Sequence, residues 1–130
     1  MEFEHFGINV PDSTAMANWY VEHCSMRIVR SMDSAPYTHF LADETGRVVI
    51  EIYSNPADPI PEHSAQHPLR FHFAFAVPDP TAVKEKLTAA GASVFEEQRF
   101  DDGTHLVMMR DPWGVPLQLC KRGTPLISQS

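Results

Sequence analysis

The first half of this chain recurs in its second half at one constant spacing. The stretch HFGINVPDSTA, beginning at His5, matches HFAFAVPDPTA, beginning at His72, and both contain HF, VPD and TA. At the same spacing and without a gap, VVIEIYSN around Glu51 falls on VPLQLCKR around Gln118. A fixed spacing that relates both ends of two segments indicates an internal duplication. The chain is therefore expected to fold as two copies of one module.

A proline-rich stretch separates the two copies. Four of the sixteen residues from Asn55 to Arg70 are prolines, which cannot donate a backbone hydrogen bond and so interrupt helices and central strands. We expect an extended connector there. The expected single domain over residues 1–130 then contains module 1 at about 1–54, the connector at 55–70, module 2 at about 71–122 and a tail without periodic pattern at 123–130. A length of 130 residues suits one compact domain.

Each module has the pattern of one strand, one helix and three further strands. Residues 4–10 alternate in polarity as a strand does, and Asp12 or Ser13 can cap the helix that follows. In the second copy Asp79 can cap, and Pro80 suits the first helical turn. The strands after the helices are expected at about 27–32, 37–42 and 47–53, then 93–98, 104–110 and 115–120. The predicted fold class is α+β, with two tandem βαβββ modules.

Side-chain alternation places four polar residues on one face of the predicted sheets. Neighbouring strand residues point to opposite faces, so the apolar residues beside the polar ones pack toward the helices. In the second module, Phe71, Phe73, Phe75 and Val77 form an apolar face fit to pack under a helix, with His72 opposite. The polar residues that face away from the helices are His5, Glu51, His72 and Gln118.

These four residues form a donor set suited to one divalent metal ion. Small residues beside the histidines, Gly7, Ala74 and Ala76, indicate a cavity rather than a filled core. Two imidazoles, a carboxylate and a carboxamide oxygen make a mixed nitrogen and oxygen site. Such a site suits Zn, Ni, Co, Mn or Fe(II), because metal availability and geometry decide among these ions more than ligand type does. The predicted metal ligands are His5, Glu51, His72 and Gln118.

Charge and cysteine content exclude several classes of protein. A formal net charge of −7 argues against nucleic acids and anionic membranes as partners, since both attract basic surfaces. A small molecule is the expected partner. Cys24 and Cys120 are the only cysteines and are far apart, which indicates reduced thiols rather than a disulfide framework. The start, MEFEHFGINV, has no signal-peptide pattern, and no run approaches the roughly 18 apolar residues of a membrane span, so we expect a cytoplasmic protein.

The order of these features resembles a known superfamily. A histidine near the start, VIEI around Glu51, a second histidine opening the repeat, and DPWG before an apolar strand with a polar residue resemble the glyoxalase, bleomycin-resistance and extradiol-dioxygenase superfamily, also called vicinal oxygen chelate. The resemblance covers the chain from His5 to about Arg122. It implies a cupped, partly open mixed β-sheet barrel with helices outside, usually in a homodimer. It also implies a metal that is chelated by adjacent oxygens of the substrate.

Compared with bacterial glyoxalase I, the chain keeps three ligand positions and changes the fourth. His5, Glu51 and His72 occupy the first three positions, and Gln118 stands where glyoxalase I has a glutamate. Asn55 falls where that enzyme contacts glutathione. However, Asn9 stands where the bacterial enzyme has an arginine for the glutathione carboxylate.

The resemblance leaves three functions open. The first is a metal-dependent lyase or isomerase, in which Glu51 is the catalytic residue and carries a proton to and from the substrate. The second is an extradiol-type Fe(II) dioxygenase, in which His5, His72 and Glu51 form the triad of two histidines and one carboxylate. The third is a non-catalytic protein that binds a small molecule such as an antibiotic, as bleomycin-resistance proteins do.

Overall fold

The computed structural model of the protein describes residues 1–127, so the last three residues of the predicted tail lie outside the described part. The chain forms two compact units, one over Met1–Pro61 and one that begins at Glu62. The elements follow the chain in this order: β1 (Phe6–Asn9), α1 (Ser13–His23), β2 (Arg27–Ser31), β3 (His39–Ala42), β4 (Val48–Tyr53), η1 (His63–Ala65), β5 (Phe73–Ala76), α2 (Pro80–Ala89), β6 (Ser93–Arg99), β7 (His105–Arg110) and β8 (Pro116–Lys121).

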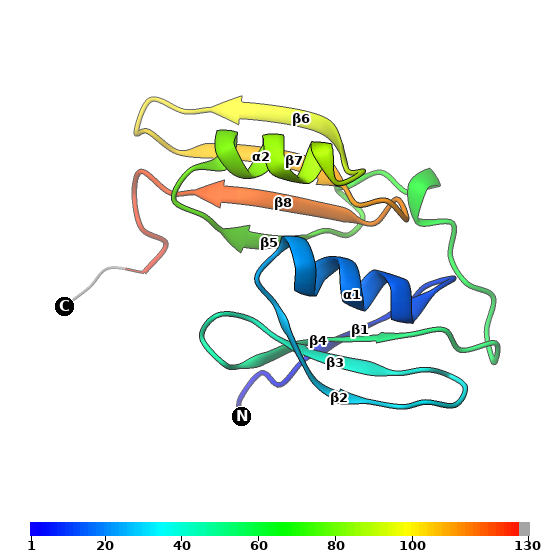
Figure 1. Ribbon diagram of the computed structural model, residues 1–130. Helices are drawn as coiled ribbons and strands as arrows, with labels where there is room; N and C mark the ends of the chain where they lie inside the picture. Colours follow the sequence, from blue (N-terminus) through cyan, green and yellow to red (C-terminus); the bar gives the residue numbers. More distant parts are fainter. Residues whose placement is uncertain (128–130) are drawn as a thin grey trace. The chain divides into compact units, whose positions relative to one another are not determined.

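In the described part of the chain, each unit contains one mixed four-stranded sheet and one α-helix (Figure 1). The first sheet has the strand order β1-β4-β3-β2, and the second has β5-β8-β7-β6. In both sheets the first strand runs parallel to its neighbour, and the remaining pairs are antiparallel. Within the described residues neither sheet closes on itself. The predicted α+β fold with two βαβββ modules is therefore confirmed.

The spacing of the sequence repeat holds where the candidate ligands lie. Gly7 of β1 is paired with Glu51 of β4, and Ala74 of β5 is paired with Gln118 of β8. The hairpins of β3 with β4 and of β7 with β8 depart from this spacing. Phe40 lies opposite Glu51, whereas the residue opposite Gln118 is Met108, one position beyond the repeat equivalent of Phe40. The duplication thus preserves the pairing of the two strands that carry the candidate site, whereas the strand beside them differs in register by one residue between the two sheets.

Both helices begin where the sequence predicts. The Asp12 side chain accepts a hydrogen bond from the Ala15 backbone N–H at 3.0 Å, and Asp79 accepts one from Ala82 at 3.1 Å. These bonds satisfy N–H groups that have no partner within the helix. Pro80 occupies the first turn of α2.

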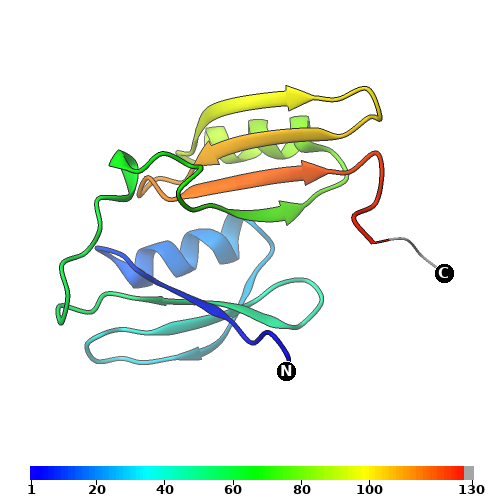
Figure 2. The ribbon, with the colours of Figure 1, turned by 180° about the vertical axis from the view of Figure 1, so that it is seen from behind.

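Figure 2 shows the β5–β8 sheet in front of α2, so one face of this sheet is free of its own helix.

The apolar residues of the central strands form the cores under the helices. α1 packs against β2, β3 and β4, and α2 packs against β6, β7 and β8. Ile50 and Ile52 are buried in the first unit, and Leu117 and Leu119 in the second. Each pair flanks a candidate ligand on the opposite face of its strand. The predicted side-chain alternation of β4 and β8 is therefore confirmed.

The expectation that the Phe71–Val77 face packs under a helix is only partly met. Phe71 is 44% exposed, and Phe73, Phe75 and Val77 are half-buried. Their rings contact one another, with 6.5 Å between Phe71 and Phe73 and 5.7 Å between Phe73 and Phe75. The reason is the position of α2, which covers β6, β7 and β8 rather than the edge strand β5.

The connector also differs from the extended segment that the prolines predict. η1 is a 3-10 turn that lies in the proline-free stretch between Pro61 and Pro68. Arg110 fixes this stretch to the second unit, because its guanidinium donates to the carbonyls of His63, Gln66 and Gly114 at 2.9–3.2 Å. The second half of the connector is thus part of the second unit.

No helix in the described part of the chain has the length and apolar character needed to cross a membrane.

A buried histidine under α1 predicts a pH dependence of stability. His39 is 7% exposed, and its ring nitrogens lie 3.0 Å from the hydroxyls of Ser31 and Thr14. Burial lowers the pKa of His39 from its ordinary value of 6.5, against a smaller opposing effect of Asp33. The unfolded chain therefore takes up this proton before the folded protein does, so stability falls as the pH drops below about 6.5.

We expect His39→Gln to lose this part of the pH dependence, since a carboxamide does not titrate. Urea unfolding at pH 7.5, 6.0 and 5.0 measures the free energy of unfolding of both proteins. The difference between wild type and variant should shrink as the pH falls. A difference that stays constant from pH 7.5 to 5.0 would exclude this role for His39.

Candidate metal centre

His5 presents one ring nitrogen toward Glu51. Its Nδ1 donates to the Glu4 carboxylate at 2.7 Å, and its Nε2 lies 3.9 Å from Glu51 Oε1. A neutral imidazole that carries its proton on Nδ1 has its lone pair on Nε2. Both side chains remain partly accessible, at 30% for His5 and 24% for Glu51. This pairing of a carboxylate with a histidine is the usual support of a metal-binding imidazole.

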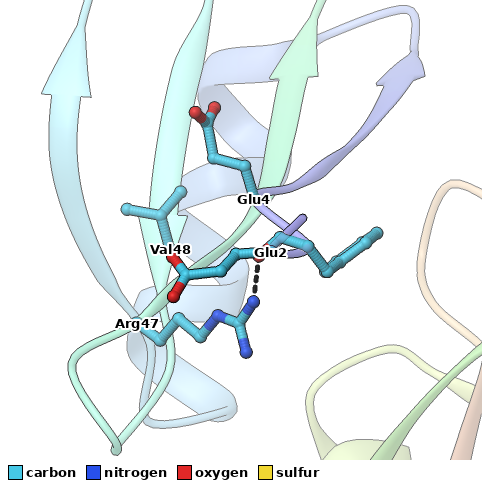
Figure 3. Close-up of a pocket in the computed structure, with 5 residues that line it drawn as sticks. Glu2, Glu4, Arg47 and Val48 are labelled. Atoms are coloured by element: carbon cyan, nitrogen blue, oxygen red, sulfur yellow. Dashed lines mark hydrogen bonds between the residues drawn. The ribbon is translucent and has the colours of Figure 1, made fainter.

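An N-terminal arm positions Glu4 for this contact. The Arg47 guanidinium, just before β4, donates to the Phe3 backbone carbonyl (Figure 3). Beside the arm lies an open pocket of about 740 Å³, lined by Glu2, Phe3, Glu4, Arg47 and Val48. Figure 3 shows the Glu4 carboxylate pointing away from Arg47. Sequence reasoning missed Glu4, although an acidic residue directly before a candidate ligand was a usable signal.

Glu51 lies in the middle of the open face of its sheet. Its strand neighbours are Gly7 on β1 and Phe40 on β3, and the Phe40 ring makes an edge contact with the His5 ring at 5.5 Å. A Cβ atom added at Gly7 would lie 3.2 Å from both Glu51 Oε1 and the Tyr53 hydroxyl. Glu51 and Tyr53 therefore pack closely against Gly7 and leave little room for a side chain at this position. Sequence reasoning missed Tyr53, which shares a face with Glu51 because it follows two residues later.

His72 has the same tautomer as His5. Its Nδ1 donates to the Pro68 backbone carbonyl at 2.9 Å. A carbonyl oxygen can only accept, so the lone pair of a neutral ring is on Nε2. On β8, Gln118 lies beside Ala74 and its Oε1 accepts a hydrogen bond from the Cys120 thiol at 3.3 Å. The buried Cys120 was expected only as a reduced thiol, and burial raises its pKa against a smaller opposing effect of Arg122.

The predicted ligands are divided between the two units. The structure brings His5 and Glu51 together in the first unit and places His72 and Gln118 on the corresponding strands of the second. Among residues 1–127, no three His, Cys, Asp or Glu side chains gather in a group that could hold a metal ion. Each unit therefore offers two of the four predicted ligands. His5 and Glu51 form the first half-site, and His72 and Gln118 form the second.

The residues of the first half-site fit a divalent ion. Metal–nitrogen and metal–oxygen bonds of about 2.1 Å place two ligands of a tetrahedral or octahedral ion about 3.0–3.4 Å apart. The 3.9 Å between His5 Nε2 and Glu51 Oε1 is within a small side-chain movement of that separation. A histidine lone pair and a carboxylate oxygen are two of the ligands that such an ion requires.

The other histidines take part in contacts elsewhere. The His105 ring hydrogen-bonds to Glu97 at 2.6 Å, and Glu97 also accepts from Lys84 of α2 at 2.9 Å. These hydrogen bonds lower the pKa of the Glu97 carboxyl. His67 Nδ1 accepts from the Leu69 backbone N–H at 3.1 Å. These contacts all lie within the second unit.

Asn9 connects the end of β1 to the segment after β4. Its side-chain amide donates to the Asn55 carbonyl at 2.9 Å, and its side-chain oxygen accepts from the Asn55 backbone N–H at 2.8 Å. The paired bonds resemble one step of a sheet ladder. The residue at this position therefore has a structural contact in this chain.

Comparisons with known proteins agree with this fold. A family model described as "Glyoxalase/Bleomycin resistance protein/Dioxygenase superfamily" matches residues 2–119. A glyoxalase family protein from Enterococcus faecalis has a similar structure, with 25% identity, a TM-score of 0.70, and coverage of 92% of this chain and 97% of that chain. No curated protein matches the sequence.

Two more distant structures share the fold. A glyoxalase I mutant from Zea mays is 23% identical, with a TM-score of 0.71 and coverage of 93% of this chain and 45% of that chain. TnmS3, an antibiotic binding protein from Streptomyces sp. CB03234, is 15% identical, with a TM-score of 0.67 and coverage of 92% and 93%. The same fold therefore occurs in an enzyme and in a binding protein.

Proposed function

Because this chain belongs to the Glyoxalase/Bleomycin resistance protein/Dioxygenase superfamily, we propose that it is a metal-dependent enzyme for a small substrate that chelates the metal through two adjacent oxygens. The reaction is a lyase or isomerase reaction by proton transfer. The ion is one of Zn, Ni, Co, Mn or Fe(II). The two half-sites meet at this ion either within one chain or between two copies in a homodimer. The metal ligands in this proposal are His5, Glu51, His72 and Gln118.

The matching tautomers of two histidines carry the proposal. His5 and His72 each engage Nδ1 with an oxygen acceptor, which leaves Nε2 of a neutral ring as a lone-pair donor. The buried His39, in contrast, uses both ring nitrogens in hydrogen bonds. The shared arrangement at repeat-related positions supports a ligand role for both residues.

In the proposed reaction, the residues at and around the first half-site have different roles. A bound divalent ion would polarise two adjacent substrate oxygens and so acidify the C–H bond between them. The Glu51 carboxylate accepts that proton and returns it to the neighbouring carbon. The Tyr53 hydroxyl, which packs against Gly7 as Glu51 does, donates a hydrogen bond to a substrate oxygen. The Phe40 ring, which contacts the His5 ring, provides an apolar wall.

Proton exchange in heavy water tests the role of Glu51. Metal-loaded protein is incubated with hydroxyacetone and dihydroxyacetone in D₂O, and NMR follows deuterium entry at the carbon beside the chelating oxygens. We expect Glu51→Gln to lower the exchange rate by at least about 100-fold, whereas Glu44→Gln in the exposed turn before β4 leaves it unchanged. Exchange by Glu51→Gln at the wild-type rate would remove this role.

One contact favours the dioxygenase as a second candidate. The Cys120 thiol already donates to the Gln118 oxygen, which suits a site where Gln118 is an uncoordinated neighbour. His5, His72 and Glu51 would then bind Fe(II) as the three-residue triad. Anaerobic loading with Fe(II), followed by catechol and oxygen, should give oxygen uptake in that case. No uptake would exclude this candidate for catechol.

A further inference from the structure

A second open pocket, of about 480 Å³, lies along β5 and the end of β8 in the second unit. Its walls are mainly small or apolar, with Ala74, Ala76, Val77 and Cys120 among them. Two cationic residues, Lys121 and Arg122, also line it, and the described residues around it include no aspartate or glutamate. In a chain with a formal net charge of −7, such a pocket is a local exception.

The pocket begins next to the second half-site. Gln118 and Cys120 are alternate residues of β8, so they share a face of the sheet, and the Cys120 thiol contacts the Gln118 oxygen. Arg122 follows two residues after Cys120, and its positive charge acts on the thiol. At about 3.3 Å per strand residue, the Cα atoms of Gln118 and Arg122 are about 13 Å apart.

We propose that this pocket binds the apolar body of an organic anion, with the carboxylate or sulfonate group at Lys121 and Arg122. Small side chains give the apolar body room, and desolvation of its surface supplies most of the binding free energy. The two cations add orientation and selectivity for an acid over a neutral analogue. If the proposed function holds, the substrate is an acid that chelates the metal at one end and reaches Arg122 at the other.

Two fluorescent probes of nearly the same shape test anion binding in metal-free protein. 8-Anilinonaphthalene-1-sulfonate carries a sulfonate, and N-phenyl-1-naphthylamine is its neutral analogue. We expect the sulfonate to bind more tightly. Arg122→Gln should weaken sulfonate binding about fivefold and leave the neutral probe unchanged. Ala76→Trp should weaken both probes, because it fills the pocket.

Lys86→Gln is the matched control, since Lys86 is exposed on α2 and its loss removes the same charge away from the pocket. If Lys86→Gln and Arg122→Gln weaken sulfonate binding equally, the proposal is overturned, because the preference for the sulfonate would then follow from the net charge of the protein alone. Equal affinity of wild type for both probes, or unchanged binding by Ala76→Trp, would overturn it as well. Circular dichroism confirms that each variant is folded. Since the probes need no metal, failure of the metal centre and failure of this pocket are separate results.

Discussion

Replacing Gly114 by alanine is expected to lower the free energy of unfolding by about 2–4 kcal/mol. Gly114 has φ +84°, a left-handed conformation that costs an alanine about 1–2 kcal/mol. A Cβ atom there would also lie 2.6 Å from Ser64 Cβ and 2.8 Å from its Cα and N atoms. Because two of these atoms belong to the backbone, a side-chain rotation cannot relieve the overlap. The connector must then move away from the turn between β7 and β8.

Gly46→Ala is the matched control for this experiment. Gly46 has nearly the same φ, +83°, but no atom lies within 4 Å of an added Cβ. We therefore expect Gly46→Ala to lower the free energy of unfolding only by the cost of the left-handed backbone conformation, about 1–2 kcal/mol. Equilibrium unfolding in urea measures both losses. Equal losses for the two variants would show that the contact with Ser64 contributes nothing.

Replacing either candidate histidine by alanine is expected to weaken divalent-metal binding by about 100-fold or more. Each loses a lone-pair donor that its hydrogen bond has already oriented. Glu4→Gln should have an intermediate effect of about tenfold, since it weakens the acceptor of the His5 Nδ1 proton without removing a ligand. Titration with Co(II) at pH 7, followed by calorimetry and visible absorption, gives the dissociation constants.

Two controls separate ligand loss from changes in charge. Glu2→Gln removes the same charge from the same N-terminal arm, and His23→Ala removes a histidine from the end of α1. Neither should change the dissociation constant. If Glu4→Gln weakens Co(II) binding no more than Glu2→Gln does, the hydrogen bond from His5 to Glu4 has no part in metal binding.

The sequence predicted the order and type of the elements well, because they depend on local signals. Asp12 and Asp79 cap their helices as expected, and the repeat aligns β1 with β5 and β4 with β8. Contacts between residues that are far apart in the sequence could not be predicted from such local signals. η1 forms because Arg110 of β7 binds backbone carbonyls of the connector, which lies before the whole second sheet in the chain. The exposure of Phe71 follows from where α2 lies, which its own pattern does not determine.

The candidate site was predictable to a similar extent. Strand alternation fixes which face a residue occupies, so Glu51 and Gln118 could be placed opposite the core. The residues that orient the ligands act through contacts instead. Pro68 contributes only its backbone carbonyl, which leaves no side-chain signal in the sequence. Tyr53 packs against Gly7 together with Glu51, and this contact could be foreseen only by knowing that β1 pairs with β4.

A crystal structure of the metal-loaded protein, with anomalous diffraction collected at the metal absorption edge, tests the central claim most directly. We expect one anomalous peak bound by Nε2 of His5, Nε2 of His72 and the side-chain oxygens of Glu51 and Gln118. A peak bound by other residues, or no peak in protein saturated with Co(II), would contradict the proposal that these four residues form a metal centre.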